Sequence, residues 1–66
     1  MQKNRLREIR LSRAITQEDL WKATGVGLAT LSRIENGHVT PRSFTKKKLA
    51  FALGVPIRMI WPVRPK

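Results

Sequence analysis

Most of the side chains in this sequence that could do chemistry are cations. Lysine and arginine account for 14 of the 66 residues and aspartate and glutamate for 4, so the formal net charge is +10. Such an excess of positive charge favours a polyanion as partner, and it points to nucleic acid ahead of an anionic membrane. Residues 41–66 carry seven of the cations and no acid, so this stretch cannot neutralise its own charge.

The sequence lacks the residue sets that an enzyme needs. It contains no Cys, and its single His, His38, has no cluster of Cys, His or carboxylate residues around it. It also has no Ser/His/Asp set, no paired carboxylates and no Gly-rich phosphate loop. We therefore expect no enzyme activity, no metal and no cofactor, and we interpret His38 as a loop residue close to phosphate.

Length and composition predict one small domain. A chain of this size buries only ~60% of the surface that its unfolded form exposes, and without Cys no disulfide can reinforce the core. The apolar fraction of 41% is nevertheless sufficient for a globular fold. No apolar run approaches the ~18 residues of a membrane span, and no signal peptide is evident. We expect a soluble cytoplasmic protein without a membrane partner.

The periodicity of apolar residues predicts an all-α fold, a compact bundle of four to five short helices. The expected helices cover about 4–13, 17–24, 28–35 and 43 or 45 to 53, followed by a short turn that has Pro56 at its first helical position. The candidate core residues are Leu6, Ile9, Leu20, Ala23, Leu31, Ile34, Leu49, Ala50 and Leu53, with Thr30 at their edge and Ile57 or Ile60 packing inward. Residues 1–61 form the expected domain, and residues 62–66 an extended tail.

The second and third expected helices form a helix-turn-helix pattern. Thr16 is a typical N-cap, and Asp19 occupies the capping-box position three residues later. Only the tight turn Gly25-Val26-Gly27 separates this helix from the next. In a helix-turn-helix the N-terminal residues of the second helix reach base edges in the major groove, so the pattern predicts that helix 28–35 enters DNA.

These motifs, taken together and in order, resemble the Xre/Cro type, or lambda-repressor-like, family of DNA-binding domains. The segments that carry the resemblance are Leu6-Arg7-Glu8-Ile9-Arg10, Thr16-Gln17-Glu18-Asp19-Leu20, Gly25-Val26, Thr30-Leu31-Ser32-Arg33-Ile34-Glu35-Asn36-Gly37 and Leu49-Ala50-Phe51-Ala52-Leu53-Gly54-Val55. They span about residues 4–61. The resemblance implies a lambda-repressor-like bundle and a sequence-specific transcriptional regulator of double-stranded DNA, with a repressor favoured over an activator.

The resemblance also implies individual roles. The positions that match DNA-contacting residues of the family are Gln17, Leu28, Ala29, Ser32, Arg33 and the loop from His38 to Arg42. Leu28 and Ala29 cannot hydrogen-bond, so we expect them to contact thymine methyl groups, whereas Arg33 can form a bidentate pair with guanine. Family members pair the first-helix arginine with the glutamate before Asn-Gly, which implies an ion pair between Arg10 and Glu35.

Three lysines in the first turns of the fourth helix, residues 46–48, oppose its dipole. We expect Lys46 and Lys47, together with Arg42, to face the phosphate backbone. Two positions depart from the family pattern. Trp21 replaces a small residue, so either its indole points outward or the two helices are splayed, and Gly27 replaces the usual Ser or Thr cap.

The apolar residues Ile57, Met59 and Trp61 form the candidate dimer interface, and we expect a homodimer on adjacent half-sites. Two alternatives remain open. The chain could act through a protein partner, as an antitoxin or an accessory DNA-binding module, or it could be a polyanion binder indifferent to sequence. Specific binding should survive an excess of unrelated DNA, whereas non-specific binding should not.

Overall fold

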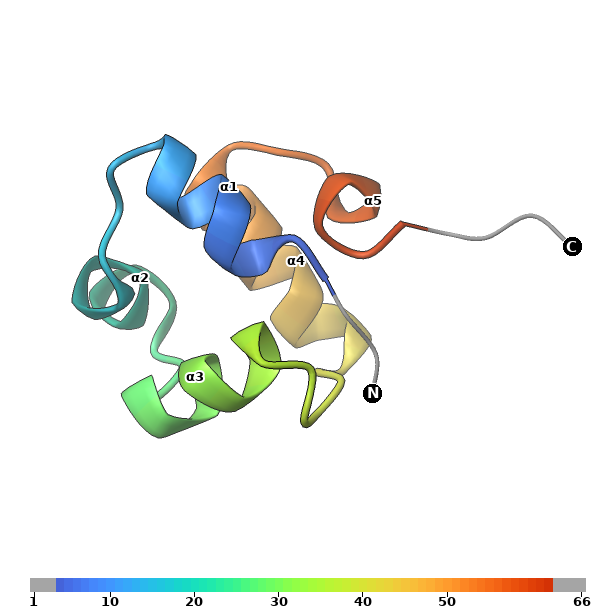
Figure 1. The fold of residues 1–66 in the computed structure, drawn as a ribbon, viewed down its shortest axis with the longest axis horizontal. Coiled ribbons are helices and arrows are strands. Elements are labelled where there is room, and N and C mark those ends of the chain that lie inside the picture. Colours follow the sequence, from blue (N-terminus) through green and yellow to red (C-terminus); the bar gives the residue numbers. More distant parts are fainter. Residues whose placement is uncertain (1–3, 63–66) are drawn as a thin grey trace, which may run out of the picture.

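The computed structural model describes residues 4–62, and within them the chain folds into five helices without a strand. The helices are α1 (Leu6–Ser12), α2 (Gln17–Thr24), α3 (Leu28–Glu35), α4 (Ser43–Leu53) and α5 (Ile57–Ile60). The predicted all-α architecture is confirmed. In Figure 1, α2 and α3 follow one another at one end of the bundle, and α5 lies at the other end. Residues 63–66 of the predicted tail lie outside the described residues.

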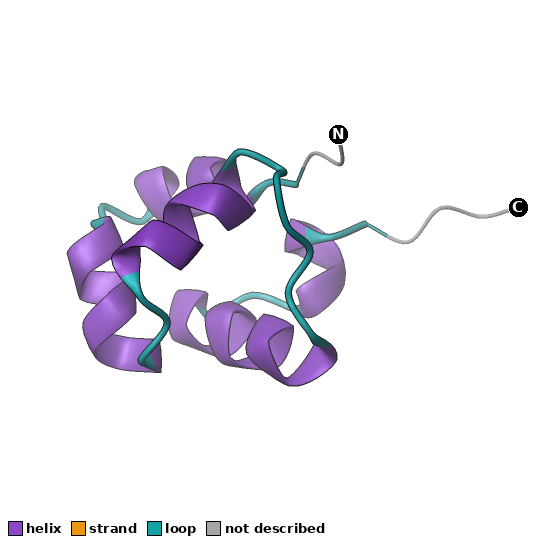
Figure 2. Ribbon diagram, turned by 90° about the horizontal axis from the view of Figure 1, so that it is seen from below, coloured by secondary structure: helices purple, strands orange, loops and turns teal. Residues whose placement is uncertain are grey.

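The five helices surround one apolar core (Figure 2). Its fully buried members come from every helix: Leu6, Leu20, Leu31, Ile34, Leu49 and Ile60. Two of the predicted core positions are wrong, because Ala23 and Thr30 are exposed. In the two-turn helix α2, Thr24 is buried in place of Ala23. The Thr24 hydroxyl donates to the Leu20 carbonyl oxygen at 2.7 Å.

Helix α2 begins with a complete capping box. The Thr16 hydroxyl accepts a hydrogen bond from the Asp19 backbone N–H at 2.9 Å, and the Thr16 backbone N–H donates to the Asp19 carboxylate at 3.0 Å. These bonds satisfy two amide groups that the start of a helix leaves without a partner. The backbone hydrogen bond from Thr16 lowers the pKa of Asp19 below its usual value, and its side-chain hydrogen bond adds to the effect.

The capping box makes stability depend on pH in acid. Folding lowers the pKa of Asp19, so its ionised carboxylate stabilises the folded protein. This stabilisation is complete above about pH 4 and is lost as the pH falls through the pKa that Asp19 has in the folded state. We expect Asp19→Asn to remove this dependence, so that the stability gap between wild type and variant narrows on acidification. Thermal unfolding at a series of pH values measures the gap. The pKa of Glu8 is lowered too, by its hydrogen bond with Arg5, but both proteins retain Glu8, so a gap that stayed constant would contradict the prediction.

The end of the chain differs from the sequence prediction at Pro56. This residue is the N-cap of α5 in an extended conformation (φ −71°, ψ 153°), not the first helical residue. Its carbonyl oxygen accepts from the Met59 backbone N–H at 3.0 Å, which starts the helix one residue later than expected. The Arg5 backbone N–H donates to the Ile60 carbonyl oxygen at 3.0 Å and thereby ties α5 to the start of α1.

None of the helices found between residues 4 and 62 combines the length and apolar character that crossing a membrane requires.

Candidate nucleic-acid interface

The turn between α2 and α3 is fixed by a left-handed glycine. Gly25 has φ +78°, which an L side chain rarely adopts, and its N–H donates to the Trp21 carbonyl oxygen at 2.7 Å. The Thr24 hydroxyl accepts from the Val26 N–H at 3.2 Å. Gly27 then opens α3 in an extended conformation without a side-chain cap. The chain therefore changes direction over three residues, and α2 packs directly on α3.

Helix α3 presents the residues expected to read DNA on its outer side. Leu31 and Ile34 are buried and anchor the helix, whereas Leu28, Ala29 and Arg33 are exposed and Ser32 is half-buried. Residues four apart lie one above the other on a helix, so Leu28 lies below Ser32 and Ala29 below Arg33. The first turn of α3 contains no acid, so no side-chain charge there would repel a phosphate.

The position of Trp21 decides between the two alternatives that the sequence left open. Its side chain is 42% exposed on α2, and α2 and α3 remain in contact. The indole therefore lies on the surface of the domain and does not separate the two helices.

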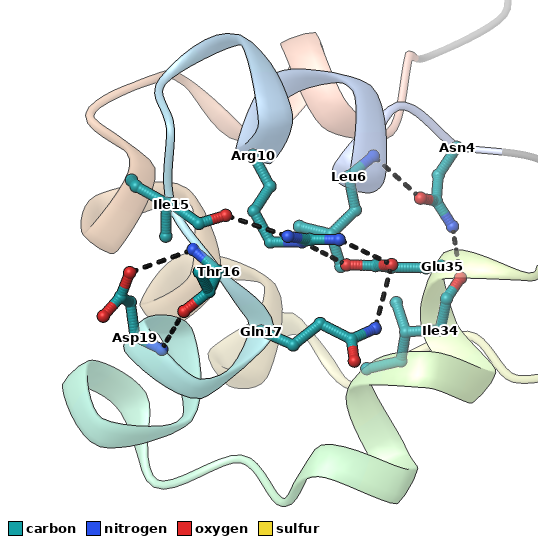
Figure 3. Close-up of polar contacts among 9 residues, drawn as sticks. All are labelled: Asn4, Leu6, Arg10, Ile15, Thr16, Gln17, Asp19, Ile34 and Glu35. Atoms are coloured by element: carbon teal, nitrogen blue, oxygen red, sulfur yellow. Dashed lines mark hydrogen bonds and ion pairs between the residues drawn. The ribbon is translucent and has the colours of Figure 1, made fainter.

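A buried polar network holds α1, α2 and α3 together (Figure 3). Arg10 Nε lies 2.7 Å from Glu35 Oε2, and the two side chains are only 8% and 4% exposed. Arg10 Nη2 donates to Glu35 Oε1 at 3.3 Å, and Nη1 donates to the Ile15 carbonyl oxygen at 2.8 Å. This fork–fork geometry is the strong form of an Arg–carboxylate pair, and it attaches the end of α3 to α1.

Gln17 joins the same network from the first turn of α2. Its Nε2 donates to Glu35 Oε1 at 3.1 Å, as the dashed line in Figure 3 shows. A side-chain amide has two N–H donors, so one remains for a phosphate oxygen. Glu35 thus fixes the orientation of Gln17, for which the family resemblance implies a contact with DNA.

Asn4 contributes a link that was not predicted from the sequence. Its Nδ2 donates to the Ile34 carbonyl oxygen at 2.7 Å, and its Oδ1 accepts from the Leu6 N–H at 2.9 Å. One side chain therefore serves the start of α1 and the end of α3 together. An Asn directly before an apolar helical stripe was the available signal, since Asn is a preferred residue at helix starts.

The remaining predicted DNA contacts are divided between two regions. His38 and Arg42 are both exposed in the segment after α3, and Arg42 is the N-cap of α4. Lys46, by contrast, has its ammonium 5.4 Å from the centroid of the Trp61 ring, and Lys47 lines a groove beside Pro56 and Ile57. Both lysines are thus turned towards the α5 side of α4 and are not brought together with α3.

The three residues of the candidate dimer interface differ in exposure. Met59 is exposed, whereas Ile57 and Trp61 are half-buried and pack against the core. Part of the apolar character noted in the sequence therefore serves the fold itself.

Comparison with known proteins places these features in a family. A family model described as "Helix-turn-helix" matches residues 6–60. The chain is 48% identical over 52 residues to an uncharacterized HTH-type transcriptional regulator, RghRB, of Bacillus subtilis (strain 168), covering 77% of this chain and 37% of that protein. It is 37% identical over 54 residues to the cryptic phage CTXphi transcriptional repressor RstR of Vibrio cholerae, covering 82% of this chain and 49% of that protein. The chain thus spans less than half the length of these relatives.

Proposed function

The chain belongs to the Xre/Cro-type helix-turn-helix family, and on that premise we propose that it regulates transcription by binding a specific double-stranded DNA sequence, as a repressor. The observation that carries the proposal is the exposed outer face of α3, held by the buried Arg10–Glu35 pair. A recognition helix needs this rigidity because base edges are read over short distances. We also propose a cytoplasmic location, because the proposed partner is DNA.

Some of the proposed contacts in the major groove are apolar. Leu28 and Ala29 contact thymine methyl groups, Arg33 forms a bidentate pair with guanine, and Ser32 lies beside them on the same face. Gln17, held by Glu35, donates its free N–H to a phosphate oxygen. His38 and Arg42 lie along the backbone next to the inserted helix. In this arrangement α3 reads the base sequence, and the flanking segments fix the position of the domain along the DNA.

A salt titration tests the phosphate roles of Lys46 and Lys47. If both lysines neutralise a phosphate, Lys46→Gln/Lys47→Gln flattens the slope of log K against log[salt] by ~0.9 for each phosphate that is no longer neutralised. Arg42→Gln provides the comparison, because Arg42 is the exposed N-cap of α4, in the segment that follows α3. An unchanged slope in the double variant, with a reduced slope in Arg42→Gln, would assign the two lysines to the α5 side alone.

We propose that the protein binds DNA as a homodimer through Ile57, Met59 and Trp61. A single module of this size covers only ~600–1,000 Å² on DNA, and a two-fold dimer reading two half-sites raises both affinity and specificity. Met59 supplies the exposed apolar contact in this proposal, with Ile57 and Trp61 beside it.

Selection of bound duplexes from a random pool tests specificity and dimerisation together. We expect palindromic half-sites with centres about one helical turn apart, and binding that survives excess unrelated DNA at moderate salt. A single unpaired site would contradict the dimer but not the regulator. Recovery of no common sequence would leave a non-specific polyanion binder, and the proposed function would be wrong.

A further inference from the structure

The outer face of α4 carries a stripe of aromatic and basic residues that the proposed function does not use as a unit. Phe44, Lys47, Lys48 and Phe51 follow the i, i+3, i+4, i+7 spacing of one helical face. Phe44 is 61% exposed and Phe51 is 88% exposed. The buried stripe of Leu49, Ala50 and Leu53 packs on the core, so α4 is apolar on two sides. An exposed apolar patch of this kind is characteristic of an interaction site.

The stripe borders a groove of about 530 Å³ between the second half of α4 and the start of α5. Ala50, Val55 and Ile57 contribute apolar lining, and Phe51 and Pro56 line it as well. Lys47 and Lys48 also line the groove and supply its cations. The volume lies within the range of ~300–1,000 Å³ that binding pockets occupy. Its apolar lining and the two lysines favour a ligand that carries both apolar and negatively charged groups.

The charge around this groove is uncompensated. The four acids of the chain all lie in α1 to α3 and already have partners: Glu8 with Arg5, Glu18 with Lys22, Asp19 with Thr16, and Glu35 with Arg10. Lys48 has its ammonium 4.8 Å from the centroid of the Phe44 ring. Within residues 4–62, no carboxylate therefore pairs with Lys47 or Lys48.

We propose that this α4–α5 face docks an amphipathic segment of a partner protein, with apolar side chains that cover Phe51 and enter the groove and with Asp or Glu residues that meet Lys47 and Lys48. A helix laid in an apolar groove is a recurrent mode of peptide recognition, and opposite charges at the rim select the partner. The inference goes beyond DNA binding and does not depend on it.

The same observations argue against two other occupants. A second copy centred on Phe51 would place the same patch against itself, which brings Lys47 and Lys48 close to their own counterparts. The proposed homodimer has its exposed apolar contact at Met59 and shares only Ile57 with this groove. The phosphates of a DNA backbone would pair with the lysines but would leave the apolar groove and Phe51 uncovered. Since α5 lies apart from α3 (Figure 1), a docked segment leaves the recognition helix accessible.

Three synthetic peptides test the proposal on the full chain. All carry leucines on one helical face, and the residues beside them are Glu in the first, Gln in the second and Lys in the third. We expect the Glu peptide to bind and to shift the amide resonances of residues 44–57 in the ¹⁵N-labelled protein. The Gln peptide should bind about tenfold more weakly, and the Lys peptide should not bind, because rim charge discriminates between partners.

Two variants and a control locate the binding face. Phe51→Ala and Lys48→Gln should each weaken the Glu peptide about tenfold or more, as the removal of a central side chain does. Leu11→Ala, which removes an exposed apolar side chain on α1, should have no effect. Circular dichroism checks that each variant retains the helical fold.

Several results would overturn the proposal. Equal binding of the three peptides, resonance shifts confined to residues outside 44–57, or no binding at all would each do so. Sedimentation analysis adds a further one: conversion of a dimer to a monomer by Phe51→Ala would assign this face to a second copy. None of these results depends on whether the protein recognises a DNA sequence, so the DNA selection and the peptide titration can fail separately.

Discussion

Replacing Glu35 by alanine is expected to lower the free energy of unfolding by about 3–5 kcal/mol. The substitution leaves the guanidinium of Arg10 buried without its carboxylate, although the two side chains are only 8% and 4% exposed in the native pair. It also removes the acceptor of Gln17. A domain of this length has a total stability of roughly 3–10 kcal/mol, so the substitution should remove a large share of that stability.

A double variant separates the cost of an unpaired charge from the net value of the pair. Arg10→Met/Glu35→Leu replaces both charges by apolar groups, and such replacements of buried pairs are often neutral or stabilising. We therefore expect the double variant to be more stable than Glu35→Ala and than Arg10→Met, as measured by urea unfolding. The Ile15 carbonyl oxygen, which accepts from Arg10 Nη1, limits the recovery. A loss below about 1 kcal/mol in both single variants would be typical of an exposed pair and would contradict the prediction.

The bounds of the helices could be predicted where a local signal marks them. Thr16 and Asp19 cap α2, and the left-handed residues Gly25 and Gly54 end α2 and α4. These signals act within a few residues of sequence, because capping hydrogen bonds and positive φ angles are local properties. The ion-pair partners Arg10 and Glu35 lie 25 residues apart, and only the family resemblance joined them.

The faces of short helices were harder to predict. An eight-residue helix such as α2 makes about two turns, so its periodicity leaves the buried direction uncertain by one residue. Thr24 is buried where Ala23 was expected, because its hydroxyl bonds within the helix and caps the turn as well. The surroundings of Lys46 depend on Trp61, which is brought to it by the packing of α5 on α4. No spacing rule in the sequence contains that information.

The net charge of +10 now has separate components. Arg5 and Arg10 have carboxylate partners, Lys46 lies over Trp61 and Lys48 over Phe44. Arg33 lies exposed on α3 among the proposed DNA contacts. Binding to a single polyanion does not require that the cations of α3 and those of α4 have different surroundings, since a phosphate backbone attracts all cations alike. The separation fits two surfaces with different chemistry, one on α3 and one on α4 and α5.

Arg33→Ala should produce the largest loss of sequence discrimination. Arg33 is exposed on the outer face of α3, one turn beyond Ala29. A bidentate contact to guanine is worth ~1–3 kcal/mol, so affinity for the selected site should fall by about 5- to 150-fold. Affinity for unrelated DNA should change much less. Repeating the duplex selection with the variant should show relaxed preference at one position in each half-site.

Arg33→Lys is the matched control, because it retains the positive charge without the planar fork that pairs with guanine. If Arg33 reads a base, the lysine variant should lose discrimination much as the alanine variant does, while its salt slope stays close to that of the wild type. If Arg33 instead contacts phosphate, lysine should restore affinity, and alanine should weaken binding to all sequences and reduce the slope by ~0.9. That second pattern would leave Leu28 and Ala29 as the base-reading residues and would make the recognition surface almost entirely apolar.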